Sequence, residues 1–463
     1  MIMEPIKISE IVKATDGKLV SGEGDIAVND IVTDSRHIQE GMFFIPLKGE
    51  KFDGHEFIAK AFESGAVGCV TENLLDGEFK DKFIIKVKST FKALHDIARY
   101  YREKFPIPFV AITGSVGKTT TKDMVAHVLG QRFEVLKTQG NFNNEIGLPL
   151  TVFRLNNQHT IGVTEMGMSG FGEISRLVSI VKPKMAVITN IGLSHIEKLG
   201  SQDNILKAKM EIFEAFDSNS VAILNGDDKR LFALKGTLPF KTVFYGIYNE
   251  ACDIKVQKIS YLGEKGSDFE LVIDQTLYTV HVPAMGEHNI YNALASIAVG
   301  LEYDISMENI MKGILLFKPE KMRLDIFQSK GIKVLNDCYN ASPTSMEAAL
   351  KVLRQMDHKN RKIAILGDML EMGEWAFEAH KKIGENVVEN NIDYLITVGY
   401  NGKSIALGAL EAGMMKENIF SFDTNEEVIK FIDSFLQDGD AILIKASRGM
   451  KMESISEHIR EVR

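Results

Sequence analysis

The stretch FVAITGSVGKTTTKDMVAHVLG, residues 109–130, sets the architecture of the central part of this chain. An apolar, β-rich run ends in a glycine-containing loop, and an amphipathic helical pattern follows directly. In such an arrangement backbone N–H groups and the helix N-terminus can face a phosphate, Lys118 can reach the β- and γ-phosphates, and the Thr119 hydroxyl can ligate Mg²⁺. The loop is shorter than the usual GxxxxGK[ST] pattern, whose first glycine would fall at Ile112. The stretch predicts an ATP site formed by Gly114, Ser115, Val116, Gly117, Lys118, Thr119 and Thr120.

Apolar strands alternate with helical segments over most of the chain. Further β-branched runs lie in residues 159–167, 184–192 and 220–228, and a second series of them begins near residue 331. Continuous runs of this kind indicate parallel sheets that are buried on both faces. We therefore expect an α/β protein of three domains: a small α/β domain in residues 1–86, a central P-loop domain in 87–316 and a Rossmann-like domain in 317–463.

Charge and cysteine content narrow the function classes. The 463 residues include 54 Lys plus Arg and 63 Asp plus Glu, a formal net charge of −9, so nucleic acid is not expected as the main partner. The three cysteines form no CxxC pair, which argues against a disulfide framework and a thiolate zinc site. The sequence shows neither a signal-peptide pattern nor an apolar run of the roughly 20 residues that a membrane span needs. We expect a cytoplasmic protein without membrane insertion.

Two polar residues follow consecutive strands of the chain, both expected in the same parallel sheet. Glu165 ends the strand after the P-loop unit, and His195 follows the next strand. Both fall at the carboxyl edge of the sheet, beside the expected phosphates, where a carboxylate suits Mg²⁺. Either residue alone is more often a solvated loop residue, so their shared edge is what favours a functional interpretation.

The order and spacing of several motifs resemble the muramyl ligases, ATP-dependent enzymes that join an amino acid or dipeptide to a nucleotide-linked cell-wall precursor. The motifs are TGSVGKTTTK at 113–122, GNFNNEIGLPL at 140–150, TEMG at 164–167, NIGLSHIE at 190–197, AKMEIF at 208–213, GEHNIYNALA at 286–295 and NDCYNASP at 336–343. Three more, TDSR at 33–36, GDMLEMGE at 367–374 and KASRGMKME at 445–453, resemble the branch that adds D-alanyl-D-alanine to UDP-N-acetylmuramoyl-tripeptide. The resemblance implies these two substrates and a role in peptidoglycan synthesis; we expect a monomer.

The mechanism implied by the resemblance uses ATP to convert a substrate carboxylate into an acyl phosphate, which an incoming amine then attacks. Two Mg²⁺ ions are implied, one held by Thr119 and Glu165 and the other by His195 and a carbamate formed on Lys209. A bare ammonium would repel Mg²⁺, whereas a carbamate offers two oxygens and no positive charge. Without the AKMEIF motif, Lys209 would be interpreted as a surface lysine. The implied catalytic residues are Lys118, Glu165, His195 and Lys209.

The resemblance also implies binding residues outside the loop. The asparagines Asn289 and Asn292 are candidates for the adenine, although Asn292 could equally be a buried residue that ties down the start of its helix. Arg323 matches a residue directed at the ATP phosphates, and Asp337 one near the ribose or the hinge. The substrate candidates are Ser35, Arg36, Asp53, Gly54 and His55 for the uridine diphosphate, Thr138, Asn141 and Asn143 for the tripeptide, and Lys445, Ser447 and Arg448 for the carboxylate of the dipeptide. A strand-end salt bridge is the alternative for the last group.

Three other functions stay open at this point. The first is a muramyl ligase that adds diaminopimelate or lysine, although the DNPR motif associated with the diaminopimelate enzyme is absent from the sequence. The second is a folylpolyglutamate synthase, which shares the P-loop and the lysine. The third is a nucleotide-binding regulator without catalysis, but such a protein would be expected to lose some of the four residues implied in catalysis.

Overall fold

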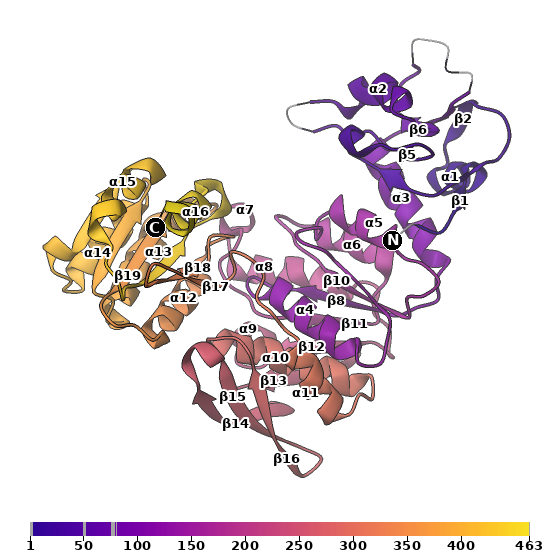
Figure 1. Cartoon of the computed structure of the whole chain (residues 1–463). Coiled ribbons are helices and arrows are strands. Elements are labelled where there is room, and N and C mark those ends of the chain that lie inside the picture. Colours follow the sequence, from indigo (N-terminus) through magenta and orange to yellow (C-terminus); the bar gives the residue numbers. More distant parts are fainter. Residues whose placement is uncertain (1–2, 50–51, 76–78, 80, 463) are drawn as a thin grey trace.

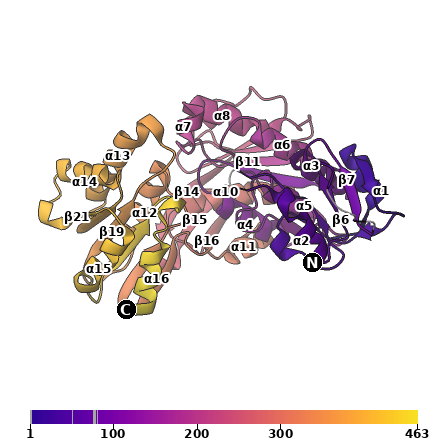
Figure 2. The ribbon, with the colours of Figure 1, turned by 90° about the horizontal axis from the view of Figure 1, so that it is seen from above.

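The chain folds into three α/β units that follow one another along the sequence (Figures 1 and 2). The computed structural model describes residues 3–49, 52–75, 79 and 81–462. The central unit lies between the N-terminal and the C-terminal unit, and one buried apolar cluster runs through all three, from Ile6 through Ile188 to Leu335 and Leu443. The α/β class with parallel sheets that the sequence predicts is confirmed. Among the described residues, no helix combines the length and the apolar character that a membrane span requires.

The N-terminal unit holds a five-stranded sheet of order β2-β7-β6-β5-β4, with β1 and β3 forming a separate pair. Strands β4 to β7 run parallel and β2 is antiparallel to β7. Its elements are β1 (Ile6–Lys7), α1 (Ile8–Thr15), β2 (Lys18–Ser21), β3 (Ala27–Val28), β4 (Ile31–Val32), β5 (Phe43–Phe44), α2 (Ile58–Glu63), β6 (Gly68–Thr71) and β7 (Phe83–Lys86).

The central unit is built on a nine-stranded sheet of order β16-β15-β14-β13-β12-β11-β8-β10-β9. Strands β8 to β14 pair with one another in parallel, as expected. Strand β15 then pairs antiparallel with both β14 and β16, an extension that the sequence patterns do not reveal. The strands are β8 (Phe109–Thr113), β9 (Val135–Lys137), β10 (Ile161–Glu165), β11 (Met185–Ile188), β12 (Val221–Asn225), β13 (Lys241–Gly246), β14 (Ile254–Tyr261), β15 (Ser267–Ile273) and β16 (Thr276–Val282).

The helix after the glycine loop, α4 (Lys118–Leu129), differs from the amphipathic helix expected there. Most of its residues are buried, because it lies between the sheet and the helices α10 and α11. A helix covered on both sides has no solvent face to make polar. The other helices of this unit are α5 (Gly147–Val152), α6 (Glu173–Val181), α7 (Ile196–Leu199), α8 (Gln202–Met210), α9 (Lys229–Phe232), α10 (Glu287–Glu302) and α11 (Met307–Leu315).

The C-terminal unit has a six-stranded sheet of order β17-β18-β22-β19-β20-β21, and only β17 runs antiparallel to its neighbour. Helices on both sides of the parallel strands give it the Rossmann-like form that the sequence predicts. Its elements are β17 (Asp325–Ser329), β18 (Ile332–Asn336), α12 (Pro343–Gln355), β19 (Lys362–Gly367), α13 (Ala376–Glu389), β20 (Tyr394–Val398), α14 (Gly402–Glu411), β21 (Ile419–Phe422), α15 (Asn425–Phe435), β22 (Ala441–Lys445) and α16 (Glu453–Val462).

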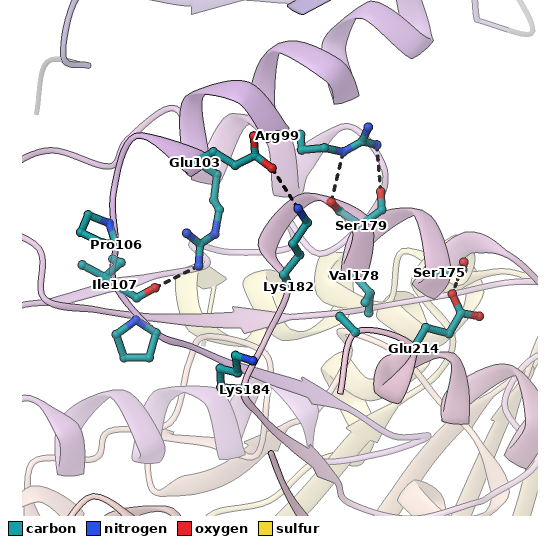
Figure 3. Close-up of a pocket in the computed structure, with 13 residues that line it drawn as sticks. Arg99, Glu103, Pro106, Ile107, Ser175, Val178, Ser179, Lys182, Lys184 and Glu214 are labelled. Carbon is teal, nitrogen blue, oxygen red and sulfur yellow. Dashed lines mark hydrogen bonds and ion pairs between the residues drawn. The ribbon is translucent and has the colours of Figure 1, made fainter. Parts of the chain in front are cut away.

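Helix α3 (Thr90–Glu103) fastens the N-terminal unit to the central one. It lines a cavity of about 1030 Å³ together with α6, and Arg99 there donates to the carbonyl of Ser179 at 3.1 Å (Figure 3). Arg102 donates to the carbonyls of Val181, Phe105 and Ile107, each at 2.9 Å. The last carbonyls of a helix lack partners within it. The two arginines therefore supply hydrogen-bond donors to carbonyls at the end of α6, and Arg102 also supplies them to the segment that follows α3.

We predict that Arg102→Met lowers the free energy of unfolding by about 2 kcal/mol, because three carbonyls lose a charged donor while the apolar stem is kept. Urea-induced unfolding followed by circular dichroism measures the change. The control is Lys88→Met, which removes an exposed cation next to α3 and should change the free energy by less than about 0.5 kcal/mol. Equal effects of the two substitutions would contradict the role given to Arg102.

Candidate active site

The glycine loop between β8 and α4 has a shape that only glycine permits at two positions. Gly114 and Gly117 have φ angles of +149° and +86°. A Cβ on Gly114 would lie 1.9 Å from the hydroxyl oxygen of Thr189, and one on Gly117 would lie 2.8 Å from Oδ1 of Asn292. Both spacings are closer than real Cβ contacts, so the two glycines allow the loop to pass against β11 and α10.

Asn190, at the end of β11, holds the loop in this shape. Its carbonyl accepts from the backbone N–H of Ser115 at 3.1 Å and its Oδ1 from that of Val116 at 3.0 Å. These two N–H groups therefore already have acceptors within the protein. In the described part of the chain, the N–H groups of residues 117–120 have no such acceptor. The first turn of α4 thus supplies the donors and the positive helix end that a phosphate requires.

Lys118 lies folded against its own loop. Its ammonium donates to the carbonyls of Gly114 and Ser115 at 2.8 and 3.3 Å. Burial lowers the pKa of Lys118, and the nearby Glu165 carboxylate opposes that shift. A phosphate at the N-terminus of α4 would offer this ammonium an anion in place of two neutral carbonyls.

Glu165 at the end of β10 presents an unpartnered carboxylate oxygen. Its Oε1 accepts from Nδ2 of Asn143 at 2.7 Å and its backbone N–H donates to Oγ1 of Thr138 at 3.1 Å, whereas Oε2 is buried without a hydrogen bond among the described residues. A buried carboxylate oxygen left without a donor is costly, and a hard cation is the ligand that suits it. With the hydroxyl of the buried Thr119 on the adjacent helix, the donor set fits Mg²⁺.

Lys209 on α8 is buried, with 2% of its surface exposed. Burial, and then repulsion by Lys118, holds its pKa well below the ordinary range. In the part of the chain that the structure describes, no carboxylate opposes these two effects on Lys209. A buried ammonium without a counter-charge is unfavourable, so the environment of Lys209 favours the neutral amine. Lys209 is therefore not a surface lysine.

His195 stands at the N-terminal end of α7 with a φ angle of +63°. Its Nδ1 lies 2.6 Å from Oε2 of Glu371, a residue of the C-terminal unit. Burial lowers the pKa of the imidazole, and the Glu371 carboxylate opposes the shift. The sequence gives Glu371 no individual role; its only signal is its place in the motif at 367–374.

A cavity of about 630 Å³ between the central and the C-terminal unit brings most of the predicted residues together. From the central unit the lining includes the loop from Ser115 to Thr120 with Asn143, Glu165, His195, Asn289 and Asn292, and beyond that unit Arg323, Asp337 and Lys445. Gly114, the first residue of the loop, does not line the cavity. The other predicted ATP residues thus share one cavity that two units complete.

The two asparagines on α10 are satisfied within the protein. Asn292 accepts from Oγ1 of Thr121 at 2.9 Å and donates to Oδ1 of Asn289 at 3.1 Å, and Asn289 donates to the carbonyl of Met285 at 2.8 Å. These bonds join the start of α10 to α4, as in the alternative considered for Asn292. Contact with adenine stays a prediction for both.

On the C-terminal side, charged groups are already paired. Lys445 lies 2.5 Å from Oδ2 of Asp337 and donates to the carbonyl of Asn340 at 2.8 Å. The guanidinium of Arg323 stacks 3.7 Å from the ring centre of Tyr339. The salt bridge considered for Lys445 is therefore present, and a dipeptide carboxylate would have to share this lysine with Asp337.

The remaining predicted residues do not line this cavity. In the N-terminal unit, Arg36 pairs with Asp34, whose pKa is held far below its usual range, and Asp53 pairs with His55 across Gly54. The others are Lys209, which is buried on α8; Ser35, in the N-terminal unit; Thr138 and Asn141 in the loop before α5; Ser447, which accepts from the N–H of Leu370 at 2.9 Å; and Arg448, which pairs with Glu453.

Comparison with known proteins gives matches along the whole chain. Three family descriptions match: "Mur ligase family, catalytic domain" at residues 27–102, "Mur ligase middle domain" at 112–300 and "Mur ligase, glutamate ligase domain" at 322–448. The UDP-N-acetylmuramoyl-tripeptide–D-alanyl-D-alanine ligase of Bacillus subtilis is 38% identical over 465 residues, which cover 100% of this chain and 99% of that protein.

Solved structures agree with this result. A crystal structure of MurF from Acinetobacter baumannii superposes with a TM-score of 0.90 at 31% identity and covers 99% of both chains. MurF ligase from Thermotoga maritima in complex with ADP matches with a TM-score of 0.82 at 29% identity, over 93% of this chain and 97% of that one. With its relatives aligned over nearly their full lengths and its P-loop cavity closed by a Rossmann-like unit, this chain belongs to the Mur ligase family.

Proposed function

We propose that this chain joins D-alanyl-D-alanine to UDP-N-acetylmuramoyl-tripeptide at the expense of ATP, in the synthesis of peptidoglycan precursors in the cytoplasm. The full-length similarity to curated ligases that carry this activity in their name supports the substrates. The observation that carries the chemistry is the edge of the central sheet, where the N-terminus of α4 and the unpartnered Glu165 oxygen line one cavity, with the buried Lys209 close enough to Lys118 for its pKa to be lowered by that residue.

In the proposed reaction, the terminal carboxylate of the tripeptide attacks the γ-phosphorus of ATP, so that ADP leaves and an acyl phosphate forms. The amine of the dipeptide then attacks the acyl carbon, phosphate leaves, and the nitrogen loses a proton as the amide forms. The first step brings two anions together and the second releases phosphate as an anion, and the N–H groups of residues 117–120 with the Lys118 ammonium are placed to bind the charged oxygens. Bound Mg²⁺ would supply additional charge neutralisation, with Thr119 and Glu165 as ligands for one ion and His195 for a second.

We further propose that Lys209 carries a carbamate. A neutral amine adds CO₂ and releases one proton, and the lowered pKa of Lys209 increases the share of the neutral form relative to an ordinary lysine. The carbamate is an anion, so it replaces the ammonium form of Lys209, a buried cation beside Lys118, with a negative charge. This change relieves the repulsion within the site and creates oxygen ligands for a cation.

The other assignments divide the substrates among the three units. We assign the uridine diphosphate to residues 1–86 through Ser35, Arg36, Asp53, Gly54 and His55, and the dipeptide to residues 317–463 through Lys445, Ser447 and Arg448. The loop with Thr138, Asn141 and Asn143 in residues 87–316 would receive the tripeptide. We assign the adenine to Asn289 and Asn292, the ATP phosphates to Arg323 and the ribose to Asp337. We propose that the protein acts as a monomer.

The substrate requirement distinguishes this ligase activity from the alternatives. Phosphate release with ATP and Mg²⁺ should require both UDP-N-acetylmuramoyl-tripeptide and D-alanyl-D-alanine, because the acyl phosphate forms on one and is consumed by the other. Mass spectrometry should find the tripeptide mass increased by one dipeptide less one water. Release with a single amino acid, or with folate and glutamate, would assign the chain a different ligase activity.

Replacing the buried lysine tests the carbamate. We expect Lys209→Ala to abolish turnover and a short added carboxylic acid to restore part of it, because the acid can occupy the space of the missing carbamate. The matched control is Lys207→Ala, which removes an exposed lysine from the same helix and should retain near wild-type turnover. Full activity of Lys209→Ala without the acid would remove Lys209 from the mechanism.

The lowered pKa of Lys209 also predicts how stability depends on pH in CO₂-free buffer. Between the lowered folded pKa and the unfolded value of about 10.4, the unfolded chain binds more protons, so the wild type becomes more stable as pH rises. Lys209→Met lacks this gain. Its advantage in unfolding free energy over the wild type should therefore shrink between pH 7 and pH 9 in urea titrations, and a constant difference would show that Lys209 is not titrating there.

A further inference from the structure

One contact between the central and the C-terminal unit is not used by the proposed reaction. Glu371 belongs to the loop after β19, and its carboxylate Oε2 lies 2.6 Å from Nδ1 of His195. The two residues are 176 positions apart in the sequence. Helix α7, which His195 begins, lies beside the C-terminal unit in both views of the chain (Figures 1 and 2).

Both partners have backbone conformations that side-chain-bearing residues rarely adopt. The φ angle is +63° at His195 and +61° at Glu371. Each such residue costs free energy, and it persists only where surrounding contacts hold it. The contacts around this pair therefore hold both residues in these conformations.

The loop around Glu371 is held independently of its carboxylate. Its carbonyl accepts from the N–H of Glu197 at 3.4 Å, and the N–H of Leu370 donates to Oγ of Ser447 at 2.9 Å. A Cβ on Gly373 would lie 3.2 Å from the side chain of Glu197, so the backbone also passes close to α7. Removing the Glu371 side chain would therefore leave the loop in place while freeing the imidazole.

The contact determines which imidazole nitrogen is available. An ionised carboxylate can only accept, so Nδ1 must carry the proton, and in a neutral imidazole Nε2 then holds the free lone pair. His195 lines the cavity with Glu165 and the glycine loop. Carboxylates that hold a metal-binding histidine in this way fix its tautomer and its orientation.

We propose that Glu371 is a positioning residue for His195: the C-terminal unit supplies the carboxylate that fixes the imidazole of the central unit with Nε2 free to bind a divalent cation. This inference rests on the proposed role of His195 as a metal ligand. It also makes that ligand dependent on where the C-terminal unit sits, since the carboxylate reaches His195 only when the two units meet at α7 and the loop after β19.

The test uses the full-length protein with ¹⁵N-labelled histidine, free of metal and then titrated with Mn²⁺. NMR reports the protonation of each ring nitrogen of His195, with the signal assigned from a His195→Gln variant. We expect the wild type to be protonated on Nδ1 and Glu371→Ala to move toward the Nε2-protonated form of ordinary histidine. Glu371→Gln, which keeps a carbonyl acceptor, should lie between them.

The Mn²⁺ concentration that broadens the His195 signal should rise about tenfold in Glu371→Ala. The control is Glu374→Ala, which removes the same charge three residues away; Glu374 forms no hydrogen bond or ion pair in the described part of the chain. An unchanged tautomer and an unchanged Mn²⁺ response in Glu371→Ala would overturn the role of Glu371 and leave that of His195 standing. A wild-type His195 signal that Mn²⁺ does not affect would instead overturn the metal role itself, and the inference with it.

Discussion

The active site depends on a charge imbalance among buried and half-buried groups. Lys118 and Lys209 are pushed toward their neutral forms by burial, and Lys118 adds its repulsion to the shift of Lys209, while Glu165 is the carboxylate that opposes the shift of Lys118. Such a site is unfavourable when empty and becomes favourable when anions and divalent cations enter together. The fold serves this arrangement: parallel strands deliver Glu165 and His195 to one edge, and the first turn of α4 supplies N–H donors beside them.

The cavity is completed only where two units meet. The central unit provides the glycine loop and the cation-binding edge, and the segment leading into the C-terminal unit provides Arg323 and, beyond it, Asp337 and Lys445. A reactive acyl phosphate requires the exclusion of water, and a cavity formed between two units can open to admit substrates and close around them. The contact between Glu371 and His195 would add a second consequence of closure, because it ties the orientation of one central residue to the position of the C-terminal unit.

Local patterns in the sequence predicted the strand, the glycine loop and the helix at 109–130, and the rule that parallel strands share an edge placed Glu165 and His195 together. Other features depend on contacts that no local pattern contains. The burial of Lys209 follows from how α8 packs, so the residue alone resembled a surface lysine until the family motif was considered. The amphipathic helix expected after the loop is buried on both sides because α10 and α11, far along the chain, cover it. The antiparallel strands β14 to β16, the hydrogen bond from Thr121 to Asn292 and the Glu371 contact are likewise products of tertiary packing.

The central claim is that one cavity holds the nucleotide and the cation against the first turn of α4. A crystal structure with Mg²⁺ and a non-hydrolysable ATP analogue tests it most directly. The account predicts the β- and γ-phosphates against the N–H groups of residues 117–120, a cation on Glu165 Oε2 and Thr119, and Lys118 moved from the loop carbonyls to a phosphate. A nucleotide bound in the cavity between α3 and α6, or phosphates at the loop with the Glu165 oxygen still unpartnered, would contradict it.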